Sequence, residues 1–338
     1  MSPSQARAQA RSRVESACEW SLAASWDHLP AGETVFASPA WLTATAKALP
    51  FELKVLEGRK EGKLACYLPL QIVRRGGLSK AFTPILTYYG GPYFPLAPGL
   101  RFHERAKLRY DLTAEALRWL DGRFHYLLLT PDDAEVRAGI DQGWDCRPRV
   151  TVLNRLRAED GRDPGGDTLR NVRKAEKAGL TLGPGRDDEA FGRAFARTFA
   201  RKGLAMRWKA EWAVALRREL TAAGLLENRS VISPEGREIA FASVALDRPR
   251  NRAVLWYSCS LEEADRTGAM HFLIQGLLDR YRADFEVFDL CGADHRGLSE
   301  FKEKFGHELF TRHALEKYRG PVSRALLGAF ARARRLAG

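Results

Sequence analysis

The order of predicted elements repeats in the two halves of the chain, and this repetition limits the possible folds most strongly. Residues 122–144 read GRFHYLLLTPDDAEVRAGIDQGW, and residues 283–306 read ADFEVFDLCGADHRGLSEFKEKFG. In both stretches a short apolar run typical of a buried strand is followed by a polar turn and a helix-like segment. A repeated order of this kind indicates tandem duplication of one αβ unit.

The flanking elements follow a similar order in each half, with two predicted strands after the first helix in the first half and three in the second. In the first half, a helix after Ser38-Pro39 precedes strands at 52–57 and 64–73, a helix over 104–121 and strands at 124–130 and 147–156. In the second half, a helix over 209–223 precedes strands at 226–233, 238–247 and 252–259, a helix over 268–282 and strands at 285–290 and 308–318. The sequence therefore predicts a mixed α/β fold. Its domains would be a degenerate N-terminal domain over 1–150, a C-terminal domain with the site over 151–320, and a basic amphipathic tail helix over 321–338.

The net charge of +12 favours anionic partners such as a nucleotide, tRNA or a membrane surface. The five cysteines are scattered and form no CxxC pair, which indicates reduced thiols in a cytoplasmic protein and argues against a metal site. Cys259 and Cys291 are expected in the core. No run of residues is apolar and long enough to span a bilayer.

Lys302 occupies an unusual position. At about 100° per residue, Leu298, Phe301 and Phe305 share one helix face, Lys302 lies at the edge of that face, and Lys304 points away. An ammonium group there must reach water, pair with a carboxylate or meet a bound anion. We therefore predict Lys302 as the residue that supplies positive charge in a site, with snorkelling to water as the alternative.

Two further polar residues come shortly before Lys302. Asp289 ends an apolar strand, so its carboxylate either pairs with Lys302 as a structural contact or orients an amine nucleophile. His295 lies in the following loop, where it is either a general base or simply exposed.

A cationic stripe is predicted on the helix within DTLRNVRKAEKAG, residues 167–179. Its members are spaced at i, i+3, i+4 and i+7: Arg170, Arg173, Lys174 and Lys177. Like charges at this spacing repel one another. The stripe is therefore either the solvated face of an amphipathic helix or a surface that contacts phosphates.

The chain resembles the Fem-like aminoacyl and acetyltransferases, which carry two GNAT-type domains in tandem. The resemblance rests on DTLRNVRKAEKAG, on LWYSCS (255–260) before ADRTGAMHFLIQGLLDRY (264–281), and on FDLCGADHRGLSEFKEKFG (288–306). It implies acyl or aminoacyl transfer from acyl-CoA or aminoacyl-tRNA to an amine or hydroxyl acceptor, in cell-envelope or polysaccharide biosynthesis, with neither donor bound tightly as a cofactor. It also places Tyr257 on the strand along which the acyl chain passes, as a proton donor to the leaving group, unless Tyr257 is an ordinary half-buried strand residue.

The sequence departs from the coenzyme A pattern of GNAT enzymes at RTGAM. The only glycine there is Gly268, preceded by Arg266, where those enzymes have a glycine-rich turn whose amides hold a pyrophosphate. These two residues remain candidates for donor binding. A non-catalytic basic scaffold or nucleic-acid-binding module is the alternative to an enzyme. The tail could contact an anionic membrane peripherally or pack on the N-terminal half, and no obligate protein partner is indicated.

Overall fold

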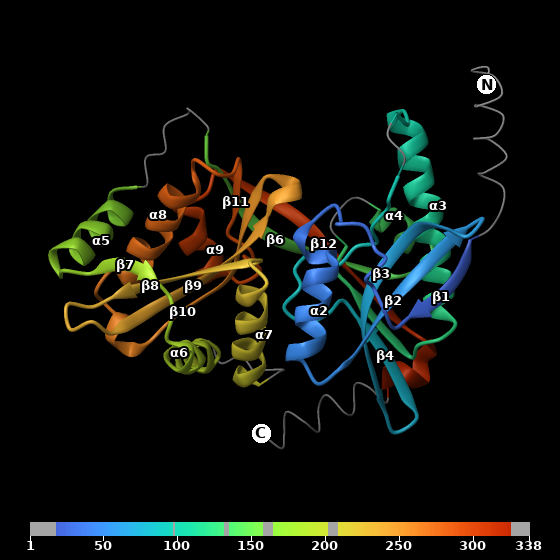
Figure 1. Ribbon diagram of the computed structural model, residues 1–338, viewed down its shortest axis with the longest axis horizontal. Coiled ribbons are helices and arrows are strands. Elements are labelled where there is room, and N and C mark those ends of the chain that lie inside the picture. The colour runs from blue at the N-terminus through green and yellow to red at the C-terminus, as the bar shows by residue number, and fades with distance from the viewer. Residues whose placement is uncertain (1–17, 97–98, 132–134, 158–164, 202–208, 326–338) are drawn as a thin grey trace. The chain divides into compact units, whose positions relative to one another are not determined.

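The computed structural model describes residues 18–96, 99–131, 135–157, 165–201 and 209–325 (Figure 1). The chain forms two compact units. Unit 1 contains Met1–Glu33, Phe51–Pro148 and His313–Gly338, and unit 2 contains Thr34–Pro50 and Arg149–Arg312. The predicted tail helix over 321–338 lies mostly outside the described residues.

Unit 1 has an antiparallel sheet completed by one parallel pair. In chain order its elements are β1 (Glu19–Ala23), β2 (Glu52–Lys60), β3 (Lys63–Arg75), β4 (Leu78–Phe82), α3 (Phe102–Asp121), β5 (Tyr126–Leu129) and α4 (Val136–Asp141). The strand order is β1-β2-β3-β4-β5-β12, where β12 is Glu308–Tyr318. Leucines of β2, β3 and β5 pack on α3 to form the core of this unit.

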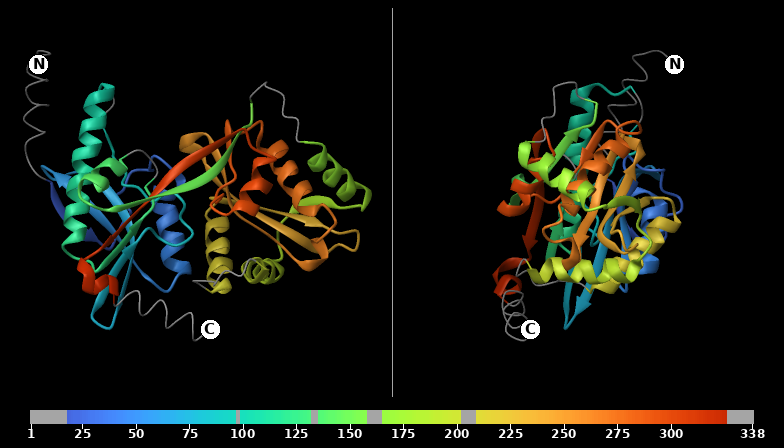
Figure 2. Two further views of the ribbon diagram at one scale, coloured as in Figure 1. Left: turned by 180° about the vertical axis from the view of Figure 1, so that it is seen from behind. Right: turned by 90° about the vertical axis from the view of Figure 1, so that its left-hand side faces the viewer.

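Unit 2 contains the elements that carry the predicted site. They are α2 (Pro39–Ala48), β6 (Asp145–Arg155), α5 (Gly166–Lys177), β7 (Thr181–Pro184), α6 (Asp188–Arg201), α7 (Ala210–Ala222), β8 (Leu226–Ile232), β9 (Glu238–Asp247), β10 (Arg252–Ser260), α8 (Ala269–Tyr281), β11 (Val287–Asp289) and α9 (Arg296–Glu303). The strand order is β6-β11-β10-β9-β8-β7. In Figures 1 and 2, α8 and α9 cover one face of this sheet, and α6 and α7 cover the other.

The repeated element order is present, and the structure adds a strand that the sequence analysis did not predict, β4. We call the two repeats the first series (β2 to β6) and the second series (β8 to β12). Each series has an antiparallel three-stranded meander (β2-β3-β4 and β8-β9-β10) followed by a helix and a parallel strand (β5 and β11). The last strand of each series pairs with a strand of the other series. β6 of the first series pairs with β11, and β12 of the second series pairs with β5. The mixed α/β fold class is confirmed.

The observed units differ from the contiguous ranges predicted from the sequence in two places. The segment Thr34–Pro50 belongs to unit 2, where Thr34 Oγ1 and the Val35 amide donate to the buried carboxylate of Asp247 at 3.0 and 2.8 Å. The chain after His313 belongs to unit 1, because the second part of β12 pairs with β5. Neither long-range pairing leaves a local signature in the sequence.

Local sequence signals explain several boundaries. Ser38 caps α2, since its hydroxyl accepts from the Trp41 amide at 3.2 Å and Pro39 fits the first helical position. The β2–β3 hairpin turns at Glu61 and Gly62, which both have positive φ, as a two-residue type I′ turn requires. β9 is apolar along most of its length because both of its faces are covered.

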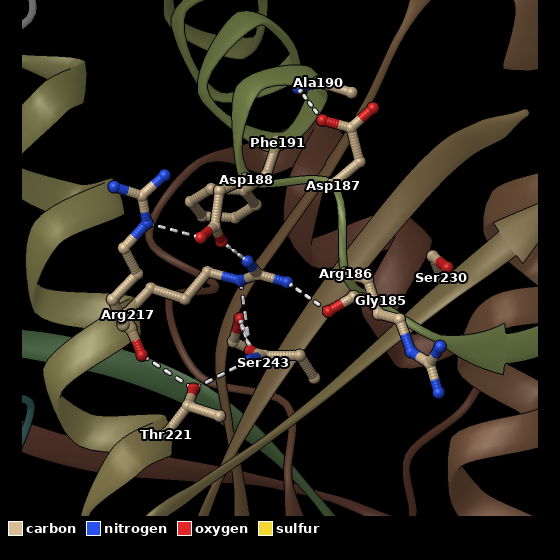
Figure 3. A network of polar contacts seen from close by, with 12 residues as sticks. Gly185, Arg186, Asp187, Asp188, Ala190, Phe191, Arg217, Thr221, Ser230 and Ser243 are labelled. Carbon is tan, nitrogen blue, oxygen red and sulfur yellow. Dashed lines mark hydrogen bonds and ion pairs between the residues drawn. The ribbon is translucent and has the colours of Figure 1, made fainter.

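A buried arginine joins α7 to the segment before α6 (Figure 3). Arg217 is 2% exposed and donates to Asp188, to the Gly185 carbonyl at 2.8 Å and to Asn228 Oδ1 at 3.1 Å. Its guanidinium also lies over the Phe191 ring, 4.8 Å from the centroid. One side chain of α7 therefore fixes the start of α6 against β8.

Candidate functional site

The parallel pair of β10 and β11 is short. β10 pairs with β9 through Ser260, but it pairs with β11 only from Arg252 to Val254. The β9 register then shifts between Leu255 and Tyr257, which marks a bulge in β10. The parallel β10–β11 ladder thus ends at Val254, while β10 continues along β9.

Tyr257 lies immediately after this bulge. It is partly buried, and its ring stacks on α6, with centroids 4.3 Å from Phe195 and 6.5 Å from Phe199. The aromatic contacts fix the ring, and the position places Tyr257 where β10 separates from β11. This location is compatible both with a role in proton transfer and with an ordinary packing role.

Lys302 is 7% exposed on α9, as its edge position predicted, and Lys304 is exposed. The Lys302 ammonium donates to the backbone carbonyls of Cys291 and of Gly292, the latter at 3.2 Å. Cys291 and Gly292 have φ values of 50° and 44°, an unusual left-handed pair that turns the chain directly after β11. Lys302 is therefore a buried cation that stabilises this turn, rather than a lysine that snorkels to water.

Asp289, at the end of β11, is fully buried. Its Oδ1 accepts from Thr151 Oγ1 and from the Cys291 amide at 2.8 Å, and its Oδ2 lies 3.9 Å from the Arg252 guanidinium. Arg252 also donates to Asp247 at 2.9 Å, so one arginine bridges two buried carboxylates. These contacts make Asp289 a second support for the turn that Lys302 also stabilises.

The predicted donor-binding residues meet where α5 lies against the start of α8. Gly268 has φ of 83°, and a Cβ added there would collide with the Asn171 carbonyl of α5. Arg266, also left-handed, is exposed in the same loop. Glycine at 268 is thus required by both its backbone conformation and the close approach of α5.

The cationic stripe of α5 is on the solvent side of the helix. All four side chains are exposed, whereas Thr168 and Ala175 face the unit. Arg170 pairs with Asp167. Within the described residues no ion pair joins Arg173, Lys174 or Lys177. The stripe is therefore available to an external anion.

The remaining predicted residues are one exposed histidine and two buried cysteines. His295 is exposed at the start of α9. Cys259 and Cys291 are buried free thiols, and burial raises the pKa of each, which confirms that they are core residues. The described residues contain no cluster of ligands suited to a metal ion.

Sequence reasoning missed His271, in the first turn of α8. Its ring packs against Phe301 and Phe305 of α9, with centroids at 5.0 and 5.8 Å, and its buried Nε2 has no hydrogen-bond partner among the described residues. Burial lowers the pKa of His271 and nearby Lys304 lowers it further, while Asp167 acts in the opposite direction. His271 lacked a sequence signal because its environment depends on α9 packing on α8.

We expect His271 to make stability depend on pH. A lowered folded-state pKa means that the unfolded chain binds a proton first, so the free energy of unfolding falls as the pH drops below the ordinary histidine value of 6.5. In His271→Leu this dependence should flatten between pH 6.5 and 5, as measured by urea denaturation. A His271→Leu slope equal to that of wild type would contradict the assignment.

A separate pocket of about 420 Å³ lies in unit 1 between α3 and α4. Several polar groups of its lining bond to one another or to neighbouring segments. Tyr110 donates to Asp141 at 2.5 Å and Lys107 pairs with Asp111 at 2.6 Å. Its lining includes none of the predicted site residues.

No protein-family model and no curated protein sequence matches the chain. Solved structures do match it. FemX superposes with a TM-score of 0.63 at 13% identity, over 86% of this chain and 94% of FemX. L-PGS from Bacillus licheniformis has a TM-score of 0.50 at 13% identity, over 88% of this chain and 90% of that one.

A tandem GNAT protein from the clavulanic acid biosynthesis pathway also matches, with a TM-score of 0.50 at 14% identity over 90% of this chain and 99% of that one. None of the helices in the described residues is both long and apolar enough to cross a membrane. At these identities the similarity concerns the fold. The chain therefore has the Fem-like, tandem GNAT fold that the sequence resemblance implied.

Proposed function

We propose that this protein is an acyltransferase that moves an acyl or aminoacyl group from a thioester or ester donor to an amine or hydroxyl acceptor. The opening of β10 from β11 after Val254 is the observation that supports it most. In the proposal, an extended ligand lies along β10 beyond the end of this ladder, next to the turn held by Lys302 and Asp289.

The proposed chemistry needs a nucleophile, a charge and a proton donor. The acceptor nitrogen or oxygen forms a bond to the donor carbonyl carbon, and the carbonyl oxygen becomes a tetrahedral oxyanion. In the proposal, Lys302 supplies positive charge at the end of β11, and Asp289 fixes the turn that carries it. The C–S or C–O bond to the leaving group then breaks, and Tyr257 gives the leaving atom a proton. The proton lost by the nucleophile passes to solvent.

The stripe of α5 would bind the anionic part of the donor. Arg173→Gln/Lys177→Gln should weaken donor binding and reduce its dependence on salt, because fewer counterions are displaced. Stability should change little, since both side chains are exposed. Affinity would be measured at several salt concentrations, beside thermal melts. Lys60→Gln/Lys63→Gln in unit 1, with the same change in charge, is the control. An unchanged affinity and salt slope would remove the stripe from the donor site.

A non-catalytic nucleic-acid-binding module remains a second candidate because the stripe is exposed and three of its members are unpaired within the described residues. Such a module would bind RNA without changing it. The two candidates therefore differ in turnover rather than in affinity.

Mass spectrometry of acceptors tests the proposed function. The full chain would be incubated with acyl-thioester and aminoacyl-ester donors and with a panel of amines, amino sugars and hydroxyl-bearing cell-envelope precursors. We expect at least one acceptor to gain the mass of the acyl group. No mass gain with any donor, together with tight RNA binding, would favour the second candidate. The cytoplasmic setting and the envelope or polysaccharide pathway belong to the same proposal.

A further inference from the structure

We infer that the loop before α8 is closed to a diphosphate and instead supports α5, so that the anionic part of a donor is held on the outer face of α5. This inference rests on the proposed function, because it assumes that the protein binds an acyl or aminoacyl donor with an anionic part. GNAT enzymes that use coenzyme A bind its diphosphate at this loop. In this chain the residues of the loop do not fit a diphosphate.

Three amides of this loop and of the start of α8 already have partners within the protein. The Asp265 amide donates to the Glu262 carbonyl at 2.8 Å, and the Thr267 amide donates to the Ala264 carbonyl at 3.3 Å. The Ala269 amide, which begins α8, donates to Thr267 Oγ1 at 3.2 Å. A diphosphate that used these three amides would have to compete with their bonds, because an anion at a helix start is held chiefly by N–H groups.

The space in front of the loop is also occupied. The Asn171 carbonyl of α5 lies so close to Gly268 that even a methyl group could not be accommodated. A carbonyl oxygen carries partial negative charge, so its presence at Gly268 opposes a phosphate electrostatically as well as sterically.

The charged groups around the loop are largely paired with one another within the protein. Glu262, Glu263 and Asp265 are exposed acidic residues within four positions of one another, and only Arg266 opposes them in the loop itself. Asp265 is further held by Arg197 and Arg201 of α6. These arginines are thereby committed to a carboxylate of the protein.

The outer face of α5 has the opposite character. Its four cations extend over about 10 Å at 1.5 Å per residue, and Arg173, Lys174 and Lys177 form no ion pair within the described residues. A ligand that matches this face carries negative charges distributed along its length, whereas a compact diphosphate would engage one or two cations.

Isothermal titration calorimetry of the full chain with coenzyme A and with inorganic pyrophosphate tests the inference. We expect either no saturable binding at a Kd below about 1 mM, or binding that Arg266→Ala leaves unchanged. Arg266 is exposed, so its truncation should not disturb the fold. A variant of the stripe, Arg173→Gln/Lys177→Gln, is titrated in parallel and should account for any residual affinity. Saturable coenzyme A binding that Arg266→Ala weakens tenfold or more, while the stripe variant retains it, would overturn the inference.

The two proposals fail differently. Coenzyme A bound at the loop would contradict the closed loop and leave an acyltransferase intact. Absence of acyl transfer to every acceptor would contradict the proposed function, and the titration would still decide whether the loop accepts a diphosphate.

Discussion

Arg217→Met is expected to lower the free energy of unfolding by about 3–5 kcal/mol, because removing one partner of a buried ion pair leaves the remaining polar groups uncompensated. The change would leave the Gly185 carbonyl and Asn228 without their guanidinium donor and would remove the buried partner of Asp188. Methionine keeps most of the apolar stem, so the loss reports the polar contacts. Urea denaturation followed by tryptophan fluorescence measures it.

Arg218→Met is the matched control for this change. Arg218 is the next residue of α7 and also bonds Asp188, at 2.5 Å, but its side chain is 65% exposed. An exposed ion pair contributes about 0–1 kcal/mol, so this variant should remain close to wild type. Equal losses for the two variants would show that burial of Arg217 does not determine the stability of unit 2.

Lys302→Met is expected to lower the rate of acyl transfer by about 10²–10³-fold, the usual effect of removing one pre-organised charge from a transition state. It should also cost about 1.5–3 kcal/mol of stability, because charge-assisted bonds to the Cys291 and Gly292 carbonyls are lost. The two effects are separated by measuring the rate at temperatures where the variant remains fully folded.

Lys304→Met provides the control, since Lys304 is exposed just past the end of the same helix. It should retain both activity and stability. If Lys302→Met loses stability and yet the folded fraction transfers at the wild-type rate, Lys302 serves only the turn and the proposed charge must come from elsewhere.

Hydrophobic periodicity was sufficient to predict most elements of this fold. The strand predicted over 308–318 is β12, and the helix and hairpin predicted over 209–247 are α7, β8 and β9 within a few residues. The position of Lys302 at the edge of a buried face could also be predicted, because it depends only on helical phase.

The partners of these residues could not be predicted. Lys302 bonds backbone carbonyls that point toward it only because Cys291 is left-handed, a conformation that a non-glycine residue rarely shows. The Asp247 carboxylate holds Thr34, which is 213 positions away in the sequence. The exchange of β6 and β12 between the two series likewise arises from long-range pairing. Contacts of this kind depend on the folded arrangement, and a single sequence does not encode them locally.

The stoichiometry of acyl transfer tests the central claim most directly. A donor with an isotopically labelled acyl group would be incubated with the full chain and the best acceptor. The moles of donor cleaved and the moles of acceptor labelled would be measured in the same reaction. The account predicts one labelled acceptor for each donor cleaved, at a rate that Lys302→Met lowers and Lys304→Met preserves. Donor cleavage without acceptor labelling, or donor binding without any cleavage, would contradict it.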